Sequence, residues 1–248
     1  MKLTIFQIGF QIILGFFIAD FVSGLFHWFE DTYLDYCLNI PFIGDISKHN
    51  ELHHYFPRSM LVYSTLETVS TTLPFIIVII FCFVIYYKFF NKKIANYFYI
   101  LFSFFFFISI SNLIHKYSHM RDCERNDIIT IIQKTGLLCS HEHHKQHHML
   151  PNKSYCVISE YNNYVLDNIH FWRMLENLIY YTTSIKPIRK ATYEDYSVIQ
   201  NYMHENAKLE CPKTPTKEDI RILQQKLHKY KDCHLCNKIG GPKNKILI

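Results

Sequence analysis

The chain of 248 residues has little glycine and little charge: there are 7 Gly, and Asp, Glu, Lys and Arg together make up 19%. So few charges in a chain that is 49% hydrophobic exclude a disordered protein, and the scarcity of glycine excludes a collagen-like or Gly-rich repeat. The positive charge is also local, because 13 of the 26 Lys and Arg but only 7 of the 21 Asp and Glu lie from Lys186 onwards. We therefore expect no nucleic-acid partner for the main part of the chain.

The motifs of several enzyme classes are missing as well. There is no Walker A or G-x-G-x-x-G phosphate loop and no G-x-S-x-G serine elbow. The segment from His141 to Lys145 begins like a zincin motif, but Lys145 stands where H-E-x-x-H needs its second histidine. The pair Cys233 and Cys236 forms half of a zinc site, and no second C-x-x-C follows it.

What the chain does have is long uncharged runs. Leu3 to Ala19 is 17 residues, Thr68 to Tyr87 is 20, and Ile94 to Ile114 is 21. A helix needs about 20 apolar residues to cross the hydrocarbon layer of a bilayer. The runs lack the polar face of a helix buried in a soluble protein, and the first lacks the cleavage site of a signal peptide. The sequence therefore predicts an all-α integral membrane protein with about three transmembrane helices.

Histidine is the second abundant feature, with 15 residues, of which 12 lie between His27 and His170. If three spans alternate across the membrane, all the dense histidine groups fall on one face, and the basic tail favours the cytosol for that face. His115 and His119 are spaced i, i+4, so they share one side of a helix. About eight histidines exceed the ligands of one tetrahedral zinc and favour two metals at a shared site.

Two classes of function use such a site. Redox chemistry on an apolar substrate at the membrane surface is one. A metal transporter or metal-binding protein with a histidine vestibule is the other, and it would require ionisable residues within the spans, which the second and third runs lack.

The histidine segments resemble a family of membrane lipid desaturases, which includes plasmanylethanolamine desaturase, the bacterial carotenogenesis protein CarF and the plant plastid desaturase of phosphatidylglycerol. Five segments carry the resemblance in the family order: 19–28 with Asp31-Thr32, His53-His54 before Pro57, 112–119, 143–148 before Pro151, and 171–176. One departure is Asn152, which stands where family members commonly have a histidine.

The resemblance implies an oxygen-dependent desaturase with two iron ions and O2 as co-substrate. It also implies the histidine ligands. Asp20 is costly to bury near the end of a membrane span, so we expect it to hold His27 or another ligand in place, and we expect Asp31 to serve likewise. The expected metal ligands are His27, His53, His54, His115, His119, His143, His144, His147 and His148. His49 and His141 stand outside the family positions.

The resemblance further implies a phospholipid substrate oxidised near its glycerol. Plasmanylethanolamine, converted to the vinyl ether of plasmenylethanolamine, is the first expectation; a phospholipid acyl chain is an alternative, and so is hydroxylation of a fatty acid or sterol. The expected electron donor is cytochrome b5, and the expected location is the endoplasmic reticulum membrane with the site in the cytosol. We expect a membrane lipid desaturase domain at 1–185 and a basic, mobile tail at 186–248.

Overall fold

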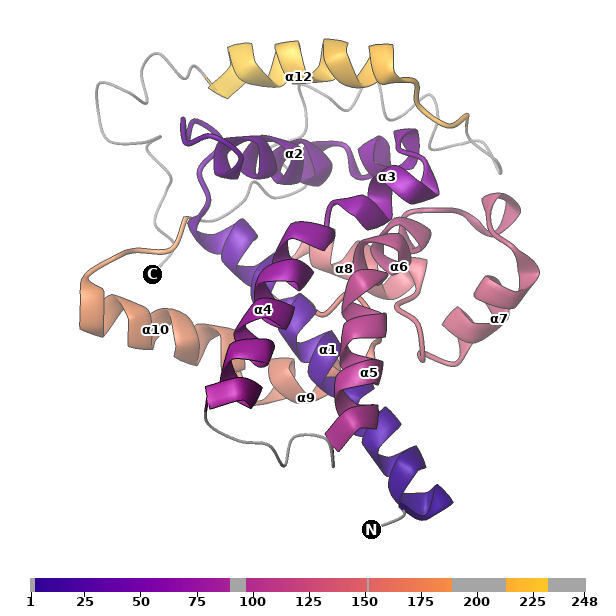
Figure 1. The fold of residues 1–248 in the computed structure, drawn as a ribbon. Coiled ribbons are helices and arrows are strands. Elements are labelled where there is room, and N and C mark those ends of the chain that lie inside the picture. Colours follow the sequence, from indigo (N-terminus) through magenta and orange to yellow (C-terminus); the bar gives the residue numbers. More distant parts are fainter. Residues whose placement is uncertain (1–2, 90–96, 151, 189–212, 232–248) are drawn as a thin grey trace.

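The computed structural model describes residues 3–89, 97–150, 152–188 and 213–231, and within these ranges it consists of helices without strands (Figure 1). The all-α prediction is thus confirmed. In chain order the elements are α1 (Ile5–Tyr33), α2 (Ile43–Tyr55), the 3-10 helix η1 (Pro57–Val62), α3 (Thr65–Ser70), α4 (Leu73–Phe89), α5 (Phe98–Ser109), α6 (Ser111–Ser118), the 3-10 helix η3 (Asp122–Glu124), α7 (Asp127–Lys134), α8 (His141–Met149), α9 (Tyr161–Asn168), α10 (Phe171–Thr183) and α12 (Lys217–Lys231).

Helix α1 is the longest element and joins an apolar half to a polar half. It begins at a capping box, in which the Thr4 hydroxyl accepts a hydrogen bond from the Gln7 backbone N–H and the Gln7 side chain accepts one from Thr4 N–H. Its 29 residues span about 44 Å at the rise of an α-helix. The first turns expose apolar side chains such as Phe6, whereas Asp20 and Asp31 farther along are buried. The N-terminal part of α1 is therefore apolar and exposed, and its C-terminal part places polar residues in the protein interior.

Helices α1 and α5 pack at very short range because small residues line their contact. A Cβ atom at Gly15 would lie 2.4 Å from the backbone oxygen of Ile100. The Ser103 hydroxyl donates to the backbone oxygen of Ile12 at 2.7 Å, which links the helices directly. Small residues allow this close approach of two backbones, as in membrane helix pairs.

Replacing Gly15 with Val should therefore destabilise the α1–α5 pair. The new side chain meets backbone, which cannot move aside, and overpacking of this kind costs about 1–3 kcal/mol. Thermal unfolding in detergent measures the effect. Gly9→Val is the matched control on the same helix, since a Cβ atom at Gly9 has nothing within 4 Å. Equal melting temperatures for the two variants would contradict this packing.

The predicted three membrane spans are not confirmed. Among the described residues, α1 alone is long and apolar enough to cross a membrane; α5 and α6 pass the same test together but are bent by 46°. The uncharged run from Thr68 to Tyr87 is divided between α3 and α4. Its division has local causes: Ser64 and Glu67 form a capping box that starts α3, and Pro74 favours a new helix start in the first turn of α4. Of α4, the strongly apolar part is Ile76–Ile85.

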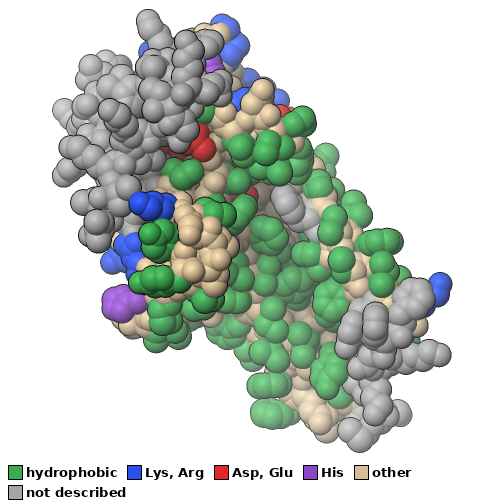
Figure 2. Space-filling model, turned by 90° about the vertical axis from the view of Figure 1, so that its left-hand side faces the viewer, with side chains coloured by type: hydrophobic (Ala, Val, Ile, Leu, Met, Phe, Trp, Pro, Cys, Tyr) green, Lys and Arg blue, Asp and Glu red, His purple; other side chains and the backbone are tan. Residues whose placement is uncertain are grey.

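Apolar and charged side chains occupy different ends of the molecule. Figure 2 shows hydrophobic side chains covering much of the middle and lower part of one face, while Lys, Arg, Asp and Glu gather largely towards the end where α12 lies. Exposed residues on α1, α4 and α5, including Phe10, Phe81 and Phe102, contribute to the apolar surface. This separation is the pattern expected of a protein that is partly embedded in lipid.

The C-terminal tail contributes a helix that is docked rather than separate. Helix α12 lies alongside α2 (Figure 1), and its Ile220, Leu223 and Leu227 are buried there. Residues 213–231 thus form ordered structure within the region that we expected to be mobile. The proposed domain boundary at residue 185 stays a prediction, and Cys233 and Cys236 lie outside the described residues.

Candidate metal centre

Helices α1, α2 and α8, and α6 with the residue that follows it, supply the histidines that cluster in the structure. The histidine-rich helix α8 starts at Ser140, whose hydroxyl accepts a hydrogen bond from the His143 backbone N–H at 3.2 Å. That hydroxyl in turn donates to the Glu160 carboxylate at 2.5 Å. Because Glu160 lies just before α9, the start of α8 is fixed by a distant part of the chain.

The buried ligand atoms form two groups, each with all its atoms within 4.8 Å of one another. We call them the five-histidine group and the carboxylate group. The five-histidine group is His53, His115, His119, His144 and His148; the carboxylate group is His27, Asp31, His54 and His147. Each group has enough ligand atoms to bind one metal ion.

The nitrogens of the five-histidine group have the spacing of ligands around an ion. His144 Nε2 lies 2.8 Å from His115 Nε2 and 3.1 Å from His148 Nε2. Two ligands at right angles around one ion, each at about 2.1 Å, are separated by about 3 Å. Both ring nitrogens of His53, and Nε2 of His119, are buried without a hydrogen-bond partner among the described residues. Burial lowers the pKa of His53 and of His144 well below the ordinary value, which keeps these rings neutral with a lone pair to offer.

In the carboxylate group, imidazole nitrogens lie close to the carboxylate of Asp31. His147 Nδ1 lies 2.7 Å from the backbone oxygen of Lys153, and since a carbonyl only accepts, the proton is on Nδ1. The Nε2 of a neutral ring then has no proton, yet it lies 3.1 Å from Asp31 Oδ2. His27 repeats the arrangement, with Nδ1 at 3.0 Å from the Tyr155 oxygen and Nε2 at 3.5 Å from Asp31.

Either an added proton or a metal cation would remove the repulsion between these atoms. Three imidazoles face the single carboxylate of Asp31, because His54 Nε2 also lies near it, at 2.9 Å from Oδ1. A cation serves all four groups at once, whereas protons would put several positive charges into a buried space. The donor set of three nitrogens and one carboxylate therefore fits a transition metal.

The two aspartates expected to support the ligands have different positions. Asp31 is a member of the carboxylate group itself, and Asn50 Nδ2 donates to its Oδ1 at 2.8 Å. Asp20 accepts hydrogen bonds from the backbone N–H groups of Ile158 and Ser159, each at 3.0 Å, and from the Ser159 hydroxyl at 2.7 Å. It thereby holds the segment that contains Tyr155, whose carbonyl orients His27.

Three of the histidines considered as ligands from the sequence lie outside both groups. His143, expected as a ligand, has Nε2 at 3.1 Å from Asn163 Nδ2 and Nδ1 at 3.9 Å from the Glu160 carboxylate. The less secure candidates His49 and His141 each have a ring nitrogen at hydrogen-bonding distance from a backbone oxygen. The structure therefore brings together eight of the nine expected ligands with Asp31, and the ligand role of His143 stays a prediction.

Variants of His143 and its neighbour His144 on α8 test whether His143 is a metal ligand. We expect His143→Gln to keep its bound metal and to retain activity within a few fold, because a glutamine amide can replace the contact with Asn163. His144→Gln should lose metal and at least about 100-fold in activity, since His144 lies within hydrogen-bond range of two other ligands. Metal content per purified chain and lipid product formation are the measurements. Equal metal loss in both variants would instead make His143 a ligand.

The residues that orient the ligands were not evident from the sequence. Lys153 and Tyr155 act through backbone oxygens, which carry no residue-type signal. Asn163 is fully buried and both accepts from Cys156 N–H and donates to Cys156 oxygen, at 2.9 and 2.8 Å. For Asn50 alone the sequence offers a signal: it precedes His54 by four residues, so the two side chains share one side of α2.

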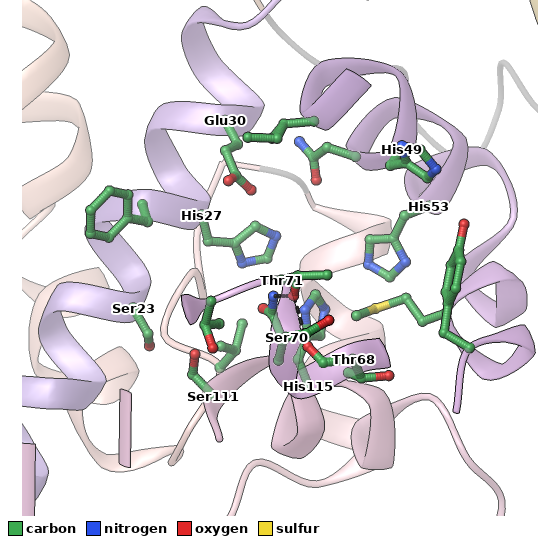
Figure 3. A pocket seen from close by; sticks show the side chains of 18 of the residues that line it. Ser23, His27, Glu30, His49, His53, Thr68, Ser70, Thr71, Ser111 and His115 are labelled. Carbon is green, nitrogen blue, oxygen red and sulfur yellow. Dashed lines mark hydrogen bonds between the residues drawn. The ribbon is translucent and has the colours of Figure 1, made fainter. Parts of the chain in front are cut away.

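A cavity of about 460 Å³ reaches both groups of ligands. Figure 3 shows Glu30 and His49 on one side of His27 and His53, with Ser70 and Ser111 on the other. The wall combines three kinds of side chain: ligands (His27, His53, His115), polar or acidic residues (Glu30, Asp45, His49) and apolar residues (Ile76, Ile79, Ile108). A cavity whose wall has both apolar and polar side chains suits an amphipathic molecule.

Comparisons with known proteins agree with this picture. Residues 16–190 match the family model described as the lipid desaturase domain. The chain is 34% identical over 203 residues to a probable fatty acid desaturase of Acanthamoeba polyphaga mimivirus, covering 78% of this chain and 92% of that protein. It is 30% identical over 190 residues to plasmanylethanolamine desaturase 1 of Mus musculus (71% and 66%) and 29% identical over 182 residues to chloroplastic fatty acid desaturase 4 of Arabidopsis thaliana (70% and 52%). No solved structure matches the chain significantly.

Proposed function

Because the chain belongs to the lipid desaturase family, as its histidine segments predict, we propose that it is an oxygen-dependent di-iron enzyme that introduces a double bond into a glycerophospholipid chain near the glycerol. Plasmanylethanolamine is the substrate that we favour, and the product is then the vinyl ether of a plasmalogen. There are two alternatives: desaturation of a phospholipid acyl chain, and hydroxylation of a fatty acid or sterol.

The observation that carries the proposal is the position of His147, whose Nδ1 faces the backbone oxygen of Lys153 while its Nε2 lies 3.1 Å from Asp31 Oδ2, beside a second group of five converging histidines. The carboxylate group would hold one iron ion and the five-histidine group the other. Bound iron supplies the activation of O2 that removal of hydrogen from an unactivated C–H bond requires and that side-chain acids and bases lack. The chain itself holds the ligands in place and excludes water, since all nine ligand residues are buried.

The cavity supports a reaction close to the lipid headgroup. Its apolar residues Ile76 and Ile79 come from α4, and Ile108 comes from α5, so a lipid chain there would follow the apolar helices. Glu30 and His49 lie beyond the ligands in the other direction (Figure 3). A lipid with its chain along α4 and its headgroup near Glu30 would pass His27 and His53 with its first chain carbons.

The acidic side of the cavity favours an amino headgroup. Glu30 and Asp45 both line it, and carboxylates attract an ammonium group while they repel an anionic phosphatidylglycerol. We expect Glu30→Gln to lower the turnover of plasmanylethanolamine about three- to tenfold, as loss of one partly exposed charge does. Asp127→Asn, an exposed carboxylate on α7, is the charge-matched control. An unchanged rate in Glu30→Gln, or an equal loss in both variants, would count against headgroup recognition here.

The proposed activity is tested by expression in cells that lack plasmalogens. Acid-labile vinyl ether lipid should appear, with a mass two hydrogens below the alkyl lipid. A new acyl double bond without vinyl ether would move the assignment to the acyl desaturases, and a gain of one oxygen would move it to the hydroxylases. Absence of all three products, from protein that contains iron and receives electrons, would refute the proposal.

We also propose that α4 and the bent pair α5 and α6 enter the membrane beside α1, with the histidine end and the tail in the cytosol at the endoplasmic reticulum. The apolar surface in Figure 2 supports entry into lipid. Electrons would come from cytochrome b5. Tags at the two ends of the chain, digested by protease in sealed microsomes, test the topology: three spans place them on opposite sides, and two spans place them on the same side.

A further inference from the structure

Helix α12 lies outside the part of the chain that matches the family model, which ends at residue 190. It nevertheless packs on α2, the helix that supplies His53 to the five-histidine group and His54 to the carboxylate group (Figure 1). We propose that α12 is an intramolecular clamp that fixes the position and rotation of α2, so that both imidazoles reach their groups. The inference rests on the metal centre proposed above and adds a positioning element from beyond the family domain.

The apolar contact between α12 and the α2 region is buried. Ile220, Leu223 and Leu227 are spaced i, i+3, i+7, so they form one stripe along α12, and Leu223 and Leu227 are 1% and 0% exposed. They belong to one buried cluster with residues from the end of α2 and its neighbours: Tyr36, Leu52, Tyr55 and Phe56. Without α12, this cluster would be an apolar patch at the charged end of the molecule, an arrangement that soluble surfaces avoid.

Polar contacts fix where α12 begins. Lys217 Nζ lies 2.9 Å from the Glu67 carboxylate on α3. Just before the helix, the backbone oxygen of Lys213 accepts a hydrogen bond from the Arg58 guanidinium at 3.2 Å. Arg58 also binds both carboxylate oxygens of Glu124, at 2.8 and 2.9 Å. The tail is thus tied to η1 and α3, which follow α2 in the chain, as well as to α2 itself.

The geometry of α2 explains why rotation matters. Successive residues of a helix project about 100° apart. Leu52, on the stripe that faces α12, is therefore about 100° from His53 and about 200° from His54. The two imidazoles leave α2 in different directions towards different groups, and neither can move without the other. Packing of Leu52 and Tyr55 against α12 sets the single rotation that satisfies both.

Two adjacent residues of α12 give a matched test in the full-length protein. Leu223→Asp places a charge in the buried contact, whereas Ile222→Asp makes the same change at a residue that is 36% exposed. Hydrogen exchange is measured first in iron-free protein, so that the result does not depend on metal or activity. We expect Leu223→Asp to speed exchange of the α2 amides about tenfold, as loss of local packing does, and Ile222→Asp to match the unchanged protein.

Iron retention is the second readout. After competition with a chelator, Leu223→Asp should hold iron about tenfold more weakly, a typical loss when support behind metal ligands is removed. Leu223→Ala is the milder variant in case the charge prevents folding, and α5 serves as the internal standard for global unfolding.

Unchanged α2 exchange when α12 exchanges faster would overturn the clamp, and so would equal acceleration of α2 and α5 in Leu223→Ala. If the protein proves not to be a desaturase, the exchange result in iron-free protein still decides whether α12 positions α2.

Discussion

An Asp31→Asn variant should lose the metal of the carboxylate group and at least about 100-fold in desaturase activity, as removal of a central ligand does. The Asp31 carboxylate lies within 3.5 Å of His27, His54 and His147, and no other acidic residue belongs to either group of ligands among the described residues. Asparagine has nearly the same size but no charge. It would present either an amide oxygen, which is a weaker ligand, or an N–H₂ group, which is none.

Iron per chain separates this loss from general damage. Because the five-histidine group has its own ligands, we expect Asp31→Asn to retain about one of two iron ions rather than none. Asp35→Asn is the control, since the Asp35 side chain accepts from the backbone N–H of Cys37 and belongs to neither group. Two irons per chain and near-normal product formation in Asp31→Asn would show that the carboxylate is not a ligand.

The histidine spacing predicted which side chains share one side of a helix, because that geometry is local. His115 and His119, and likewise His144 and His148, are four residues apart, and helical periodicity alone places each pair on one side. The expectation that the segments meet came from the three predicted membrane spans, which would place them on one face. Neither argument could separate His143 from its neighbour, because one residue turns the side chain by about 100°, and only packing against Asn163 of α9 shows which way it projects.

Features that depend on distant contacts or on helix ends were less predictable. The run from Thr68 to Tyr87 contains no charge, so hydropathy treats it as one segment, whereas Pro74 and the caps of α3 divide it. The tail has high charge and no family resemblance, which predicts mobility. The role of its apolar stripe at Ile220, Leu223 and Leu227 could be recognised only from the structure, which shows the residues of α2 that the stripe covers.

Replacing Asp20 with Asn should weaken both the fold and the metal centre, although Asp20 contacts no metal ligand directly. Its carboxylate accepts from the N–H groups of Ile158 and Ser159 and from the Ser159 hydroxyl. Bonds to a charged acceptor contribute about 1.5–3 kcal/mol each, so we expect a loss of roughly 2–4 kcal/mol when an amide replaces the carboxylate. The released segment includes Tyr155, whose carbonyl accepts from His27 Nδ1, and iron binding should fall about tenfold through that contact.

The comparison with Ser159→Ala shows whether the backbone bonds are responsible. That variant loses the hydroxyl contact at 2.7 Å but keeps both N–H contacts at 3.0 Å, so the segment should stay in place. We expect a fall in melting temperature less than half that of Asp20→Asn, and normal iron content. Thermal unfolding in detergent and iron analysis on the same preparations give both quantities. Equal effects of the two substitutions would mean that Asp20 acts through the Ser159 hydroxyl alone, and normal iron content in Asp20→Asn would separate the segment from the orientation of His27.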